Sequence, residues 1–208
     1  MIGAAMHRFR QIVLVALAAG IAVGCGTSRP MKYYVLETPA PPEPASPPQF
    51  PVTLLVARVT ASDLYREDRL VFAASPVELG TYEYQRWAEP PVDMIQDELI
   101  ASLRATRQFR AVSPVASDLR GDYLLRAHLD ALDEVDSPQM AAHFAIQLEL
   151  YDAKSGSTVW SDSYSHDQPV TGKKVEDVVE ALNQDVKNGM DQVTSNLTQY
   201  FAARPAAK

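Results

Sequence analysis

Large apolar side chains alternate with small or polar ones between residues 144 and 150, and this is the clearest pattern in the chain. Phenylalanine, isoleucine and two leucines occupy positions 144, 146, 148 and 150. A period of two predicts a strand with one buried face. The segment 152–157 has the composition of a turn, and β-prone residues resume at 158–160. The two runs therefore predict a β-hairpin.

Shorter β-prone runs precede this hairpin, and we expect each of them to form a strand. They lie at residues 33–36, 52–59, 70–73, 78–84, 109–112 and 123–132. The runs on either side of Ser75-Pro76 predict a second hairpin. The segment 39–51 is too rich in proline for a helix or a central strand, so it predicts an extended surface loop. A polyproline recognition site is the alternative interpretation of that segment.

Two other segments carry apolar residues at helical spacing. The first follows Pro90-Pro91 and has its apolar residues at 92, 95, 99 and 103. Proline is tolerated in the first turn of a helix, so this pair predicts where the helix begins. The second segment is an apolar stripe from Val175 to Phe201. We expect it to form one long helix that lies on the sheet.

Together these segments predict an α+β fold, in which a mainly antiparallel β-sheet is packed by two helices. We expect a single domain over residues 33–203, followed by a short tail at 204–208. The chain has 19 basic and 26 acidic residues, a net charge of −7, which argues against a nucleic-acid partner. Cys25 is the only cysteine, so we expect neither a disulfide nor a thiolate metal site.

The first 24 residues have the layout of an export signal. Basic His7, Arg8 and Arg10 precede an apolar run at 12–23, which is shorter than the ~20 residues that span a bilayer. Small residues then lead to the cysteine, and Ala22-Val23-Gly24-Cys25 resembles a bacterial lipobox. The alternative is an uncleaved N-terminal anchor in which the cysteine is unmodified.

The lipobox resemblance implies a lipid anchor. The signal peptide 1–24 would be removed, the Cys25 thiol would carry a diacylglycerol, and residues 25–32 would form a tether. Two or more acyl chains hold a protein at a membrane stably. Gly26 stands where inner-membrane lipoproteins often carry aspartate. We therefore expect the periplasmic face of the outer membrane of a Gram-negative bacterium.

Side chains capable of catalysis are present but form no recognised motif. Histidines lie at 128, 143 and 166, and none has the spacing of a His-Glu-x-x-His site. The acidic group at 130–136 lacks the pattern of a calcium loop, so we expect a solvated charge cluster. We predict no enzyme activity, no cofactor and no metal. The catalytic alternative is a periplasmic hydrolase that uses His166 or Asp162.

Three segments of the chain carry a family resemblance: Tyr33-Tyr34-Val35-Leu36, Leu70-Val71 and Tyr84-Gln85-Arg86-Trp87-Ala88-Glu89-Pro90. They resemble the ABC-transport auxiliary lipoproteins, the PqiC-like components of paraquat-inducible and related MCE transport systems. The resemblance implies an outer-membrane lipoprotein that docks an MCE-domain protein of an inner-membrane complex and helps lipid to pass between the membranes. It implies no nucleotide binding. A ring-like homo-oligomer would match a multimeric MCE assembly, although no residue indicates one.

Arg86 and Trp87 are the candidate partner-binding residues, because arginine and tryptophan are typical of interface hot spots. The alternative for the tryptophan is a buried structural role between a hairpin and a helix, and the sequence favours it. A second functional hypothesis is a regulatory lipoprotein that activates a cell-wall synthase through a proline-rich reach. The prolines lie between two expected strands, where they add no reach, so we rank this hypothesis lower.

Overall fold

The computed structural model describes residues 29–37, 47–75, 77–136 and 139–204. The predicted signal peptide, Cys25 and most of the proline-rich segment lie outside the described residues. The chain divides into two compact units, residues 1–30 and 31–208, and every described helix and strand belongs to the second. Within the described ranges, no helix has both the length and the apolar character needed to cross a membrane.

The longest strands are β7 (Tyr123–Val135), β8 (Ala141–Asp152) and β9 (Ser157–Pro169), which are antiparallel. The predicted hairpin of β8 and β9 is confirmed. Its turn contains Gly156 at φ +69°, a left-handed conformation that glycine adopts without strain. The Asp152 carboxylate accepts hydrogen bonds from two backbone N–H groups of the turn, at residues 154 and 155.

A second hairpin joins β4 (Arg69–Ser75) to β5 (Glu78–Trp87), which confirms another prediction. Strand β1 (Lys32–Tyr34) pairs with the last residues of β5 and lies at one edge of the sheet. Strand β2 (Phe50–Val56) begins within the segment expected to be a proline-rich loop. The short elements β3 (Thr60–Ala61) and η1 (Asp63–Tyr65) follow it.

The sheet is mixed, so the prediction of a mainly antiparallel sheet was wrong. Five of the eight strand pairings among the described residues are parallel. One edge of β7 pairs with β8, and its other edge is shared in turn by β2, β3 and β4, which all run parallel to it. Strand β2 also pairs with β6 (Phe109–Pro114). Parallel neighbours require long connections, and a period of two reveals a strand but not its neighbour.

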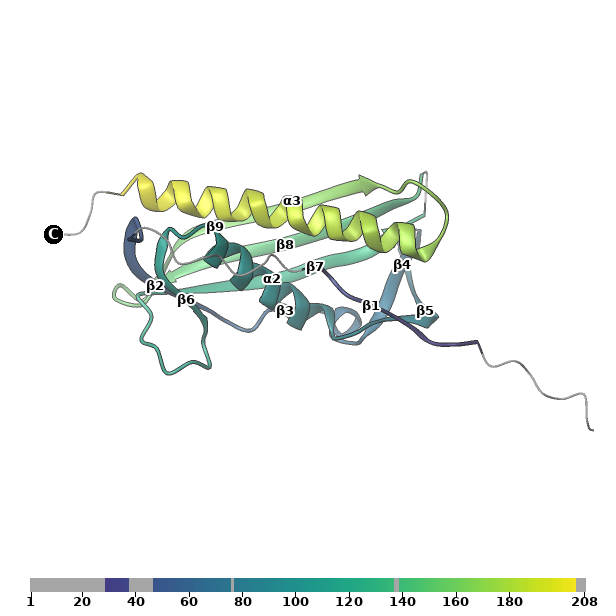
Figure 1. Ribbon diagram of the computed structural model, residues 1–208, viewed down its shortest axis with the longest axis horizontal. Helices are drawn as coiled ribbons and strands as arrows, with labels where there is room; N and C mark the ends of the chain where they lie inside the picture. The colour runs from purple at the N-terminus through teal and green to yellow at the C-terminus, as the bar shows by residue number, and fades with distance from the viewer. Residues whose placement is uncertain (1–28, 38–46, 76, 137–138, 205–208) are drawn as a thin grey trace, which may run out of the picture. The chain divides into compact units, whose positions relative to one another are not determined.

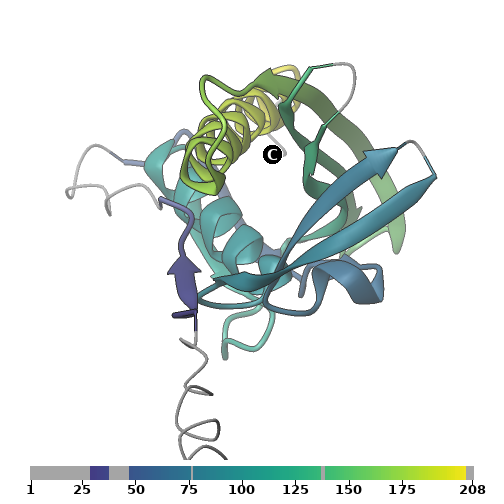
Figure 2. The ribbon, with the colours of Figure 1, turned by 90° about the vertical axis from the view of Figure 1, so that its right-hand side faces the viewer.

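Helices α2 (Pro91–Ala105) and α3 (Val175–Ala202) lie on the same side of the curved sheet (Figures 1 and 2). Both helices were predicted, and Pro91 occupies the first turn of α2 as expected. The apolar stripe of α3 is buried, and the helix packs mainly on β8 and β9. The predicted role of α3 as a cover for the sheet is therefore confirmed.

Aromatic rings fix the last turn of α3 against the start of three strands. The Phe201 ring lies 5.6 Å from Phe50 in β2, 5.4 Å from Phe109 in β6 and 5.1 Å from Tyr123 in β7, measured between ring centroids. Aromatic pairs at such distances add about 0.5–1.5 kcal/mol each beyond the area that they bury. One side chain of α3 thereby holds together strands that are distant in the sequence.

Candidate functional site

A fully buried carboxylate positions α3 on the sheet. Asp185 accepts hydrogen bonds from the Phe144 N–H (3.1 Å) and the Tyr164 hydroxyl (2.7 Å), and it lies 2.7 Å from His166 Nδ1. Burial and this carboxylate raise the pKa of Tyr164 above its usual range. One turn further on, a Cβ at Gly189 would lie 2.8 Å from atoms of two aromatic rings. The helix can approach the sheet this closely because that position is glycine.

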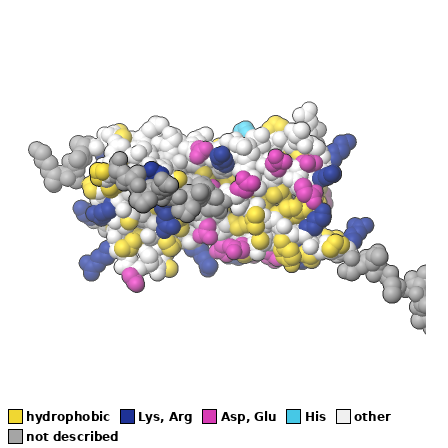
Figure 3. All heavy atoms as spheres, viewed as in Figure 1, with side chains coloured by type: hydrophobic (Ala, Val, Ile, Leu, Met, Phe, Trp, Pro, Cys, Tyr) yellow, Lys and Arg dark blue, Asp and Glu magenta, His cyan; other side chains and the backbone are white. Residues whose placement is uncertain are grey.

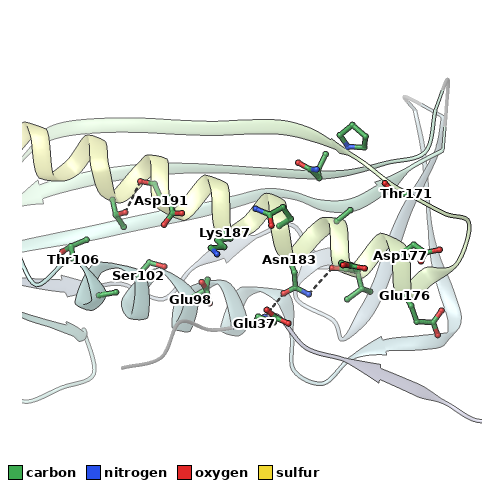
Figure 4. Close-up of a pocket in the computed structure, with 18 residues that line it drawn as sticks. Glu37, Glu98, Ser102, Thr106, Thr171, Glu176, Asp177, Asn183, Lys187 and Asp191 are labelled. Carbon is green, nitrogen blue, oxygen red and sulfur yellow. Dashed lines mark hydrogen bonds between the residues drawn. The ribbon is translucent and has the colours of Figure 1, made fainter. Parts of the chain in front are cut away.

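A groove of about 1170 Å³ separates the two helices, and Figure 4 shows the side chains that line it. Its walls come from α2, α3, the end of β9 and the segment after β1. Figure 3 shows acidic side chains gathered over the same face of the domain. The charged residues of the lining are Glu37, Glu98, Glu176, Asp177, Glu180, Asp191 and Lys187. Acidic residues therefore outnumber basic ones by six to one in this lining.

Some of these carboxylates have structural partners. Glu176 accepts a hydrogen bond from Lys32 Nζ at 2.6 Å, and mainly this bond lowers its pKa to about 2. The Asp177 carboxylate accepts hydrogen bonds from two backbone N–H groups just before α3 and caps the helix. The Glu37 N–H donates to the Asn183 side chain at 2.6 Å. The bonds of Lys32 and of the Glu37 N–H fasten β1 and the following segment to the first half of α3.

The lining of the groove decides what it can bind. Acyl chains require apolar surface, and a carboxylate packed against one loses its hydration without compensation. The lining also contains apolar Ala105, Pro169, Val179 and Ala181, but the excess of carboxylates makes the groove better suited to a cationic ligand. The groove therefore gives no support for lipid carriage inside this domain.

Two acidic residues at the end of β7 are buried, so the expectation of a solvated charge cluster was wrong for them. Asp133 and Glu134 are each 5% exposed, and their carboxylates accept hydrogen bonds from the hydroxyls of Tyr65 and Tyr82, respectively. Burial raises the pKa of Asp133 and of both tyrosines above their ordinary values. These bonds connect η1 and β5 to the central strand and form no open site.

Three residues of the outer sheet face have a spacing that the sequence did not predict. His143 Nδ1 lies 3.2 Å from the Asp167 carboxylate, and its Nε2 lies 3.3 Å from the Ser165 hydroxyl. Many hydrolases use a serine, a histidine and an aspartate in this order. Here Ser165 lies in extended backbone opposite Ala145 of β8, and successive N–H groups of a strand point in opposite directions and do not converge on one oxygen. We can therefore assign no oxyanion hole, which usually supplies the largest share of catalysis.

The residues named for the hydrolase alternative have separate partners. His166 lies against Asp185, whereas Asp162 accepts a hydrogen bond from Asn196 of α3 at 2.9 Å. Across residues 29–37, 47–75, 77–136 and 139–204, no group of three or more His, Cys, Asp or Glu side chains could hold a metal ion.

The predicted partner-binding residues lie at the end of β5. Trp87 is fully buried in the core, and its backbone N–H donates to the Asp68 carbonyl. Arg86 forms an ion pair with the Asp68 carboxylate at 2.6 Å, and its side chain is 21% exposed. The register places Arg86 opposite Tyr33 of β1. Of the two candidates, only Arg86 reaches the surface.

Residues 34–194 match the family model of the ABC-type transport auxiliary lipoprotein component. The match extends from β1 to the last third of α3 and includes the segment around Arg86. The chain belongs to this lipoprotein family. The recognition made from the sequence is thereby confirmed. An auxiliary transport component interacts with a transporter, so the family supports the prediction of a transport partner.

Solved structures show the same fold as this member of the family. A protein from Xanthomonas campestris, assigned to the family DUF330, is 24% identical with a TM-score of 0.69, covering 82% of this chain and 94% of its own. An uncharacterized protein is 16% identical with a TM-score of 0.64, and the match covers 83% of this chain and 99% of that protein. A hypothetical protein from Chlamydia trachomatis is 9% identical with a TM-score of 0.53, and the match covers 74% of this chain and 99% of that protein. No curated protein matches the chain significantly.

Proposed function

We propose that this protein is a periplasmic lipoprotein, anchored in the outer membrane, that serves as a non-catalytic component of an MCE-type lipid transport system. It would dock an MCE-domain protein of an inner-membrane complex and help to maintain the envelope. The observation that carries the proposal is the family match over residues 34–194. The lipobox-like sequence that ends at Cys25 supports the lipid anchor.

The chemistry of the domain favours docking over lipid carriage. The groove between α2 and α3 has an acidic lining, and the carboxylates at the end of β7 are engaged with tyrosines. A lipid carrier needs a continuous apolar surface for acyl chains. A docking role needs only a stable domain with a specific surface contact, and this domain has the packed core for it.

We assign the partner contact to Arg86. Its guanidinium is held by Asp68 and is still accessible, so little side-chain entropy would be lost on binding. Trp87 would act indirectly, since its buried ring holds the end of β5 in place. An arginine at the centre of an interface commonly costs 2 kcal/mol or more when it is truncated.

Capture of an MCE-domain protein from the same bacterium by the full lipidated chain tests this proposal. Arg86→Ala should weaken capture about thirtyfold, the equivalent of about 2 kcal/mol. Arg58→Ala is the matched control, because Arg58 is also a surface arginine paired with an aspartate, Asp93 at 3.6 Å. Failure of the wild-type chain to capture the protein would refute the transport function. Equal capture by both variants would refute only the contact at Arg86.

The lipid anchor has its own test. Mass spectrometry of the protein purified from membranes should show a chain that begins at Cys25 and carries diacylglycerol, and Cys25→Ser should release the chain from the outer membrane. An intact Met1 with an unmodified cysteine would contradict the anchor.

A further inference from the structure

The segment 31–36 contains the three-residue edge strand β1 and extends it by one residue before and two after, and its side chains have an unusual distribution. Successive residues of a strand point to opposite sides. The inward set contacts α3 or the core and consists of Lys32, Tyr34 and Leu36. The outward set is apolar although nothing in the described domain covers it; it consists of Met31, Tyr33 and Val35, which we call the β1 flank.

The β1 flank is well exposed. Met31 is 40%, Tyr33 63% and Val35 59% accessible to solvent. Single exposed apolar residues are ordinary, but three at alternate positions form a continuous strip. Edge strands usually carry charged residues there, because an apolar edge invites unwanted association. Such a strip is typical of a surface that meets a membrane or a partner.

The tether limits what can cover it. Met31 is the sixth residue after Cys25, so a fully extended tether places it within about 20 Å of the cysteine. If that cysteine carries the lipid, the flank is the first apolar surface of the domain along the chain from the bilayer. The occupant most accessible to the flank is then the bilayer itself.

The charges beside the flank do not oppose such a contact. The protein is acidic, and an acidic surface is repelled by anionic lipids. Beside the flank, however, Glu176 is paired with Lys32 and Asp68 is paired with Arg86, each at 2.6 Å. These pairs neutralise two of the carboxylates beside the flank, and the Glu37 carboxylate remains. Tyrosine is also characteristic of membrane interfaces, where its hydroxyl stays hydrated while its ring is buried.

We infer that the β1 flank rests on the periplasmic surface of the outer membrane, with its side chains at the boundary between phospholipid headgroups and acyl chains. This inference rests on the proposed lipid anchor. The acyl chains supply the attachment, and the flank fixes how the domain is oriented on the bilayer. Arg86 lies opposite Tyr33 in the register, so it would then lie close to the outer membrane. A partner that spans the periplasm would reach the outer membrane at this point.

The experiment uses the full lipidated protein in vesicles of phosphatidylethanolamine and phosphatidylglycerol. Because lipidation blocks the native thiol, an introduced cysteine is the only one that an environment-sensitive fluorophore can label. Tyr33→Cys and Val35→Cys place the label on the flank. Val115→Cys is the matched control, since Val115 is a 49% exposed valine just after β6. Figure 1 shows that β6 and β1 lie toward opposite ends of the sheet.

Nitroxide-bearing lipids should quench both flank labels at least twofold and leave the Val115 label unchanged. Firm attachment without quenching at the flank would overturn this inference and leave the anchor intact. A different result would show that a second copy of the chain covers the flank. In that case the flank label would become shielded from water in detergent as the protein concentration rises, and it would not be quenched in vesicles. Failure of the wild-type protein to attach to vesicles would overturn the anchor and the inference together.

Discussion

Removal of the Asp185 carboxylate should greatly weaken the contact between α3 and the sheet. Asp185→Ala leaves the Phe144 N–H, the Tyr164 hydroxyl and the His166 ring without their acceptor. The His166 side chain is 48% exposed and can turn to water, so two donors stay buried. Each buried unpaired donor costs about 1–3 kcal/mol. Relief from burying a charge offsets part of this cost, and we expect a loss of about 2–4 kcal/mol in the free energy of unfolding.

A second substitution separates the loss of charge from the loss of the acceptor. Asp185→Asn keeps one oxygen that can accept from the Phe144 N–H, and its amide group can donate to the Tyr164 oxygen. It should therefore cost only about 1 kcal/mol. Asp191→Ala is the control, because Asp191 is an exposed aspartate of the same helix. Such a surface change should stay within about 0.5 kcal/mol of the wild type.

Urea unfolding followed by far-UV circular dichroism measures these differences, provided that the slope of the transition is the same for all variants. The expected order of stability is wild type, then Asp185→Asn, then Asp185→Ala. The reasoning would be refuted if Asp185→Ala unfolded at the same urea concentration as the wild type. It would also fail if the asparagine variant were the less stable of the two, because the acceptor would then not be the cause.

Two further predictions concern the same helix. Gly189→Ala should lower the free energy of unfolding by about 1 kcal/mol, because a Cβ 2.8 Å from Phe144 and Tyr164 costs more than the gain in helix propensity. An unchanged urea midpoint would contradict the close contact. The pKa of Glu176 falls from 4.5 to about 2 on folding, so its bond to Lys32 contributes above pH 4.5 and is lost as the pH falls towards 2. The protection factors of the β1 amides, which correct hydrogen exchange for the pH dependence of the intrinsic rate, should therefore fall over that range in the wild type, and Glu176→Gln should abolish this step.

The sequence alone determined the elements whose signals are local. The β8–β9 hairpin follows from a period of two with turn residues beside it, and α2 follows from an adjacent proline pair and helical spacing. The segment 84–90 indicated the family that the comparison confirmed. Each of these signals lies within a few residues of the structure that it predicts, so no knowledge of distant contacts was needed. The lipid at Cys25 stays a prediction of the same local kind.

Only the tertiary structure decided which faces are covered and which strands are neighbours. The glycine at 189 reads as a weak point in a helix, yet it is where α3 meets the sheet most closely. Asp133 is buried by Tyr65, 68 residues away in sequence, and β7 gains three parallel neighbours from distant segments. Tyr33 and Val35 read as ordinary strand residues until the fold leaves them exposed. Periodicity marks two faces of an element, but long-range packing selects the face that meets the core and the face that is left for a membrane or a partner.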